Sequence, residues 1–217
     1  MDRTTSKAAA RGRLAKASSF ALFIARAGEV LYVLSAAIML ILEVLYFALP
    51  EAFVASDDGY GASYPIGGAR LNITGGYLGS EVRLARWGSD GTTMELNPPS
   101  VIIAGLTVLA ISVLMVLTFH EVARMCVDMR RWMRDPDGTT PFGVGLAPRL
   151  MRIGTYLIAV PAITLVSDAA LLVLTDIGGS TNPMGLFVYL LLGILAILLS
   201  RVFDYGAALQ EDVDGLL

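Results

Sequence analysis

The chain has 217 residues, of which 55% are hydrophobic and 16% are charged, and its mean hydropathy is +0.67. Soluble domains carry about 25% charged residues, so this composition excludes an ordinary soluble domain and indicates an integral membrane protein. The single cysteine, Cys126, excludes an intrachain disulfide, and with the single histidine, His120, it excludes a His/Cys metal cluster within one chain. We expect no metal site, no cofactor, no catalytic residue and no nucleic-acid binding, and therefore a protein that is not an enzyme.

Residues 1–28 form a basic N-terminal segment, because the first 26 residues carry six basic groups and one acid. The segment predicts an amphipathic helix on the anionic cytoplasmic leaflet, with a bend at Gly28. The alternative is a plain topogenic tail. Glu29, just after it, is expected to be solvated or paired with Arg26.

Four apolar stretches, at about 30–50, 99–120, 153–175 and 184–201, are long enough to cross a membrane, which takes roughly 20 residues. They predict an all-α, four-helix membrane bundle over residues 29–203.

The loop at 51–98 is too long for a simple turn and alternates apolar and polar residues between glycine-rich breaks. This pattern predicts a small β-hairpin or three-stranded β cap outside the membrane. The residues expected on its half-buried faces are Ala69, Leu71 and Ile73, then Val82 and Leu84, then Met94 and Leu96.

The second loop, residues 121–152, is rich in arginine, and the second helix should continue through it to Arg134 before "DPDG" turns the chain. By the positive-inside rule, this loop and both termini are cytoplasmic. The abundance of alanine and the scarcity of lysine favour a bacterial protein, and hence the bacterial inner membrane.

Polar groups inside the spans are costly and tend to face protein or water. Glu43, Thr107, Asp168 and Tyr189 fall at comparable depth, so we predict an intramembrane polar cluster. It is either a site that shares a proton or binds a cation, or a structural contact that fixes the order of the helices.

The last 14 residues, 204–217, form an acidic cytoplasmic tail that should continue the fourth helix. Tyr205, Leu209 and Val213 fall on one helical face, and the tail also carries Glu211 and Asp212. That face should dock either on the chain's own second helix or on another protein. The basic groups offered by the second helix are Arg124, Arg130, Arg131 and Arg134.

The segments "TTPFGVGLAPRLMRIG" and "RVFDYGAALQEDVD" resemble the bacterial membrane proteins of domain-of-unknown-function family 2975. The matching positions are Gly138, Pro141, Phe142, Arg149, Leu150, Ile153, Gly154, Tyr205, Gly206, Leu209, Gln210, Glu211, Asp212 and Asp214. The resemblance implies four spans with a sizeable first loop, and a link to regulation at the membrane.

These features predict a non-enzymatic regulator or adaptor that contacts the lipid bilayer and presents a cytoplasmic surface to a partner protein. The first alternative is an accessory or structural subunit of a larger membrane complex, which could be bioenergetic. The second is a small transporter or channel that uses Glu43 and Asp168.

Overall fold

The computed structural model describes residues 3–74, 76–77, 80–89, 92–134, 145–175 and 181–214. The side chains of residues 3–16, 132–134, 211, 213 and 214 lie outside this description. The motif positions Gly138, Pro141 and Phe142 also lie outside the described residues.

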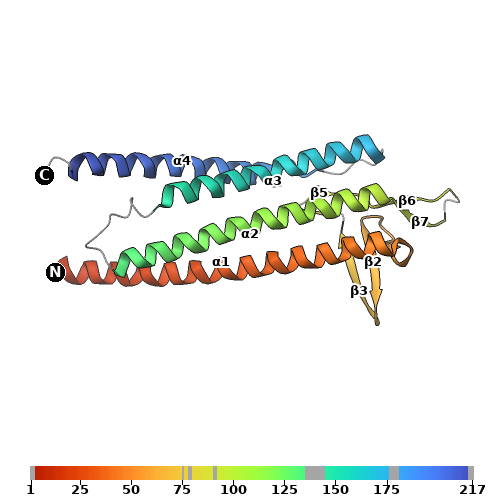
Figure 1. Cartoon of the computed structure of the whole chain (residues 1–217), viewed down its shortest axis with the longest axis horizontal. Helices are drawn as coiled ribbons and strands as arrows, with labels where there is room; N and C mark the ends of the chain where they lie inside the picture. Colours follow the sequence, from red (N-terminus) through yellow and green to blue (C-terminus); the bar gives the residue numbers. More distant parts are fainter. Residues whose placement is uncertain are drawn as a thin grey trace. The chain divides into compact units, whose positions relative to one another are not determined.

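The described chain is mostly helical and contains four long helices, each with a stretch long and apolar enough to cross a membrane (Figure 1). This confirms the four predicted spans. The helices are α1 (Arg3–Ala48), α2 (Pro98–Arg134), α3 (Leu146–Thr175) and α4 (Pro183–Asp214). Each of α2 and α4 begins at a proline, whose fixed φ and missing N–H suit the first turn of a helix.

The helices extend beyond the apolar stretches on the side where the arginines lie. As predicted, α2 continues to Arg134, and α4 continues through the tail to Asp214. The bend expected at Gly28 is absent, because α1 is one helix through this position. Gly28 instead lies against the ring of Phe119, 2.8 Å from where a Cβ would be, so the glycine permits close packing of α1 on α2.

The described residues of the loop between α1 and α2 form seven short strands in three separate sheets, where we expected a single hairpin or three-stranded cap. A short 3-10 helix, Pro50–Ala52, precedes them. The strands are β1 (Val54–Ala55), β2 (Gly61–Ile66), β3 (Ala69–Thr74), β4 (Gly76–Tyr77), β5 (Ser80–Glu81), β6 (Ala85–Trp87) and β7 (Met94–Leu96). The described strands pair antiparallel. In the largest sheet β2 lies between β1 and β3, and the other two sheets pair β4 with β5 and β6 with β7.

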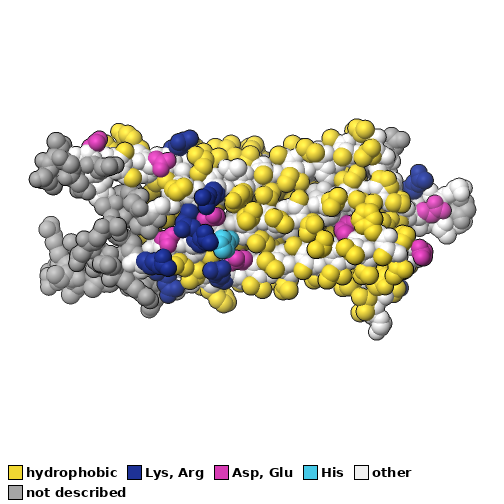
Figure 2. Space-filling view, in the orientation of Figure 1, with side chains coloured by type: hydrophobic (Ala, Val, Ile, Leu, Met, Phe, Trp, Pro, Cys, Tyr) yellow, Lys and Arg dark blue, Asp and Glu magenta, His cyan; other side chains and the backbone are white. Residues whose placement is uncertain are grey.

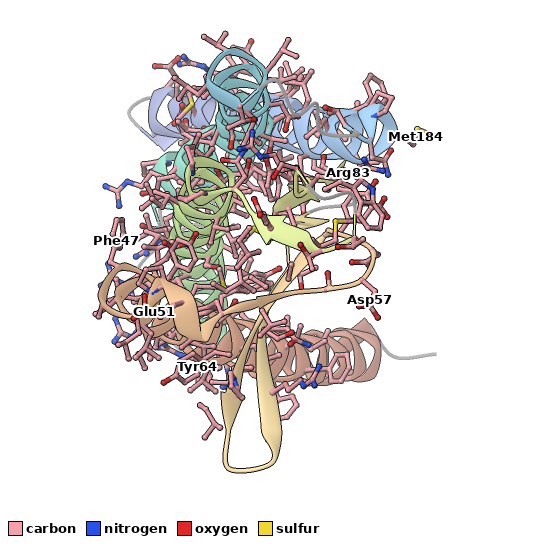
Figure 3. The ribbon with its side chains drawn as sticks, turned by 90° about the vertical axis from the view of Figure 1, so that its right-hand side faces the viewer. Phe47, Glu51, Asp57, Tyr64, Arg83 and Met184 are labelled. Atoms are coloured by element: carbon pink, nitrogen blue, oxygen red, sulfur yellow. The ribbon has the colours of Figure 1, made fainter. Side chains whose placement is uncertain are left out.

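The largest sheet contains β2, which the alternation pattern missed because it includes Pro65. Its hairpin with β3 projects beyond Tyr64 (Figure 3), and Leu71, expected on a half-buried face, is exposed there. Val82 and Leu84 are fully buried as expected, but they lie between β5 and β6 and not in a strand.

The chain divides into two compact units, each of which includes parts of all four helices. Unit 1 comprises residues 1–31, 115–158 and 191–217, and unit 2 comprises residues 32–114 and 159–190. In both units, large apolar side chains such as Phe23, Leu34, Val173 and Leu195 are exposed. An apolar surface of this extent is unfavourable in water and suits contact with lipid.

In unit 1, α3 and α4 pack with their backbones in contact. A Cβ at Gly154 would lie 2.7 Å from the carbonyl oxygen of Gly193, and one at Gly193 would lie 2.9 Å from the carbonyl oxygen of Gly154. Farther along the same pair of helices, the Ser200 hydroxyl donates to the carbonyl of Ala147 at 2.8 Å. Small residues at the contact and a hydroxyl that bonds across it are the usual means of joining helices in lipid.

Replacing Gly154 by Ala tests this contact. A glycine-to-alanine change inside a helix normally stabilises it by about 1 kcal/mol, but here the new Cβ would collide with a backbone carbonyl, and overpacking costs about 1–3 kcal/mol. We expect Gly154→Ala to lower the melting temperature of the detergent-solubilised protein, while Leu198→Ala on the exposed face of α4 leaves it nearly unchanged. A higher melting temperature for Gly154→Ala would contradict the packing.

Candidate functional site

Charged side chains gather in unit 1, where the apolar stretches of the helices end (Figure 2). On α1, Glu29 accepts a hydrogen bond from Arg26 Nη1 at 2.6 Å. On α2, Nδ1 of His120 lies 2.9 Å from the other carboxylate oxygen of Glu29. The expected pairing of Glu29 with Arg26 is therefore confirmed, and His120 adds a link from α2 to α1 that we did not predict.

A second set of ion pairs joins α2 to α3. Glu121 accepts hydrogen bonds from Arg149 Nη1 at 3.1 Å and from Arg152 Nη1 at 3.0 Å, one on each carboxylate oxygen. Nη2 of Arg149 also lies 2.8 Å from Asp128. Since Glu121 and Asp128 are about two turns apart on α2, Arg149 bridges two carboxylates on one helix face.

The carboxylates in this region are largely covered, and apart from Arg149, which is 22% exposed, the guanidinium groups lie on the outside. The side chains of Glu29, Glu121 and Asp128 are between 8% and 17% exposed, whereas those of Arg26, Arg131 and Arg152 are between 53% and 80% exposed. We call this group the charged belt: Arg26, Glu29, His120, Glu121, Arg124, Asp128, Arg131, Arg149 and Arg152. Its outer surface is therefore positive.

The sequence contained a signal for the belt that we did not use. The acids Glu121 and Asp128 are spaced seven residues apart on α2, and Arg149 and Arg152 are spaced three apart on α3. Both spacings place the side chains on one face of a helix, and the opposite charges predict a contact between the two faces.

The arginines of α2 that were expected to pair with the acidic tail lie in other environments. Arg124 is exposed, Arg131 lies 3.9 Å from Asp128 on its own helix, and Arg130 interacts electrostatically with Cys126. The side chain of Arg134 lies outside the described residues. Among the described side chains, no ion pair joins these arginines to the tail.

The predicted docking face of the tail is also uncovered. Tyr205 is 68% exposed and Leu209 is 48% exposed, so the expectation that this face docks on the second helix is wrong. The partly covered face of the α4 end is instead formed by Phe203, Gly206, Ala207 and Gln210. Asp212 is exposed, and the side chains of Glu211 and Val213 lie outside the described residues.

In unit 2, the structure joins two members of the predicted intramembrane cluster, Asp168 and Thr107, through hydrogen bonds and leaves Glu43 outside that group. Asp168 accepts hydrogen bonds from the Tyr77 hydroxyl at 3.2 Å and from the Thr181 hydroxyl at 2.6 Å. The hydroxyl of Tyr77 also bonds Ser167. These contacts fasten the loop residue Tyr77 to α3, and periodicity within the spans could not predict them because Tyr77 and Thr181 lie outside the helices.

Two other members of the predicted cluster have their own partners. The Thr107 hydroxyl lies 2.5 Å from the Ser167 hydroxyl, which links α2 to the group around Tyr77. Tyr189 on α4 is partly buried and lies near Tyr32 of α1. Burial raises the pKa of Tyr77 to about 12, so this phenol stays protonated and remains a donor to Asp168 over the physiological pH range.

Glu43 stands apart from this group. It is 4% exposed, and neither of its carboxylate oxygens has a hydrogen-bond partner among the described residues. The carboxyl group occupies the space above Gly105 of α2, where a Cβ would overlap it. The carboxyl of Glu43 therefore packs against Gly105, and no hydrogen bond among the described residues joins it to Asp168.

Unit 2 also contains an open apolar groove of about 420 Å³ between α2 and α3. Small side chains line much of it, including Ala110, Ala162 and Ala170. Among the described residues, no three His, Cys, Asp or Glu side chains are grouped so as to hold a metal ion.

No protein-family model matches the chain, and neither the curated proteins nor the solved structures include a match. The resemblance to domain-of-unknown-function family 2975 therefore stays a prediction.

A mutant cycle tests the packing of Glu43 on Gly105. Gly105→Ala should lower the melting temperature strongly, because the added methyl group and the carboxyl cannot occupy the same space. In a Glu43→Ala background the same change should cost little, because the space is then free. Equal costs in the two backgrounds, measured by thermal unfolding in detergent, would show that the two residues are not in contact.

The bridging role of Arg149 gives a second test. Arg149→Gln leaves Glu121 with one arginine partner and removes the ion pair between Asp128 and α3. Breaking a fully buried ion pair costs about 3–5 kcal/mol and an exposed one about 0–1 kcal/mol, so this part-buried pair should fall between the two. We expect this variant to be clearly less stable than Arg124→Gln, which removes the same charge from an exposed side chain. The measurement is urea unfolding of the two variants in the same detergent, and similar midpoints would argue against the bridge.

Proposed function

We propose that the chain is a non-enzymatic regulator or adaptor of the bacterial inner membrane that presents the end of α4 to a partner protein. The observation that carries this proposal is an uncovered apolar stripe on that end, formed by Val202, Tyr205 and Leu209. Self-docking was the alternative explanation for the stripe, and these three side chains are all exposed.

The length of α4 supports a position outside the hydrocarbon for most of the stripe. A span of roughly 20 residues that starts at Pro183 ends near Val202, and the first charged residue of the helix, Arg201, falls at the same point. Tyr205 and Leu209 follow it. Exposed apolar side chains are unfavourable in water, and a partner that covers them would relieve this cost.

The acids beside the stripe indicate the chemistry of the partner. Asp204 and Asp212 are exposed, and they form no ion pair with the described arginines. An amphipathic helix with an apolar face and flanking basic residues complements this surface, in the manner of other helix-based recognition. Because the arginines concentrate at 1–26 and 121–152, the positive-inside rule makes this surface cytoplasmic.

A second candidate function, an accessory subunit of a larger membrane complex, is favoured by the apolar groove of unit 2. Helices associate in lipid through small residues that allow close approach, and Ala110, Ala162 and Ala170 line this groove. The occupant would be a membrane-spanning helix of the complex. A transporter that uses Glu43 and Asp168 together receives no support, because the two carboxyl groups have separate surroundings.

Replacing Leu209 by Asp tests the adaptor proposal. A charge in the centre of the stripe should reduce recovery of the co-purifying partner from mild detergent extracts by at least tenfold, while the melting temperature changes little because the side chain is exposed. Ala208→Asp adds the same charge at an exposed position outside the stripe and should leave recovery unchanged.

Two outcomes would contradict the proposal. If partners are recovered equally with wild type and Leu209→Asp, the stripe does not bind them. If recovery is instead lost on replacing Ala162 by Leu, which fills the groove of unit 2, the accessory-subunit function is the correct one.

A further inference from the structure

The charged belt of unit 1 has more positive than negative charge. Five arginines (Arg26, Arg124, Arg131, Arg149 and Arg152) lie with three carboxylates (Glu29, Glu121 and Asp128). Counted without His120, the surplus is two positive charges. The ion pairs within the belt therefore leave positive charge for an external anion.

The surplus charge is on the outside of the belt. The three carboxylates are largely covered, and the arginines around them are more exposed. Arg124 is exposed and forms no ion pair with the described acids, although it lies between Glu121 and Asp128 in the sequence. Arg131 is 80% exposed and reaches Asp128 only at 3.9 Å.

Arg124 and Arg131 lie on one flank of α2. They are seven residues apart, which corresponds to about two turns and roughly 10 Å along the helix. Arg26 of α1 and Arg152 of α3 are also exposed, and Figure 2 shows several Lys or Arg side chains grouped on the visible face of unit 1. Guanidinium groups bind phosphate through paired N–H donors, so this arrangement suits a phosphate group.

The position of the belt along the helices identifies the source of the phosphate. From the belt to the opposite end, residues 30–48 of α1, 98–119 of α2 and 153–175 of α3 each contain about the 20 residues that cross the hydrocarbon. The belt therefore lies at the hydrocarbon boundary, which is the level of the lipid headgroups. A headgroup reaches this site directly from the adjoining leaflet.

We propose that Arg124 and Arg131, together with the outer arginines of the belt, bind the phosphate of an anionic phospholipid headgroup. This lipid site is separate from the stripe on α4 and does not depend on the partner protein. Its local effect would be to hold the ends of α1, α2 and α3 in contact with one leaflet.

Native mass spectrometry of the full-length protein in detergent tests the site, with phosphatidylglycerol and phosphatidylcholine of identical acyl chains as probes. Each basic residue near a membrane surface contributes about 1 kcal/mol of attraction, which corresponds to roughly fivefold in affinity. We expect wild type to bind phosphatidylglycerol more tightly than phosphatidylcholine. Arg124→Gln should lose about fivefold of that preference, and Arg124→Gln combined with Arg131→Gln should lose roughly 25-fold.

Two variants serve as controls. Arg70→Gln removes the same charge from an exposed position in β3, outside the belt, and should retain the full preference. Arg124→Lys keeps the charge and should retain most of it. The melting temperatures of all variants identify any loss of lipid preference that is due to unfolding. Arg131→Gln alone repeats the test at a second exposed arginine.

Three results would overturn the proposal. The first is equal binding of the two lipids by the wild-type protein. The second is a loss of preference in Arg70→Gln as large as that in Arg124→Gln, which would indicate a general charge effect. The third is displacement of phosphatidylglycerol by millimolar inorganic phosphate, which would identify the ligand as a soluble anion.

Discussion

The free-energy cost of placing charge in hydrocarbon governs the arrangement of this chain. Four helices of the described chain have apolar stretches long enough to cross the region where charge is costly, and charged residues appear on each helix where its stretch ends. On three helices these residues meet one another: Glu29 with His120, and Glu121 with Arg149 and Arg152. The ion pairs that join the helix ends therefore coincide with the ends of the apolar stretches.

Within the spans, packing depends on small side chains and on polar groups that find partners. Gly154 and Gly193 bring α3 and α4 into backbone contact, and Gly105 makes room for Glu43. On α3, Asp168 accepts hydrogen bonds from the hydroxyls of Tyr77 and Thr181. These contacts explain how a chain with so much apolar surface facing outward holds a defined arrangement within each unit.

The sequence predicted the spans well because a run of about 20 apolar residues has few alternatives to a membrane helix. It predicted the polar cluster poorly, because similar depth on different helices does not show which way a side chain faces. Asp168 has partners from a loop and an interhelical connection, and Glu43 faces a glycine that offers no hydrogen bond. The strand β2 was missed because Pro65 and the glycines around it hide the alternation.

The prediction that Tyr205 and Leu209 dock on α2 failed for a related reason. In a soluble helix the apolar stripe marks the buried face, but in a membrane helix the exposed face is apolar as well. On α4 the partly covered face includes Gly206 and Ala207, while Tyr205 and Leu209 are exposed. Small residues were therefore the better indicator of protein contact, as they are at Gly154 and Gly193.

The central proposal is the topology drawn from the distribution of arginines, with the termini and the 121–152 loop in the cytoplasm and the loop between α1 and α2 outside the membrane. The most direct measurement places a single cysteine at Arg70, in the exposed part of β3, in a chain whose native Cys126 is replaced by Ser. A thiol reagent that cannot cross the inner membrane should label this cysteine in intact cells, and it should label Asp212→Cys only after the membrane is opened. Protection of the cysteine at position 70 in intact cells, with labelling of the one at position 212, would contradict the account.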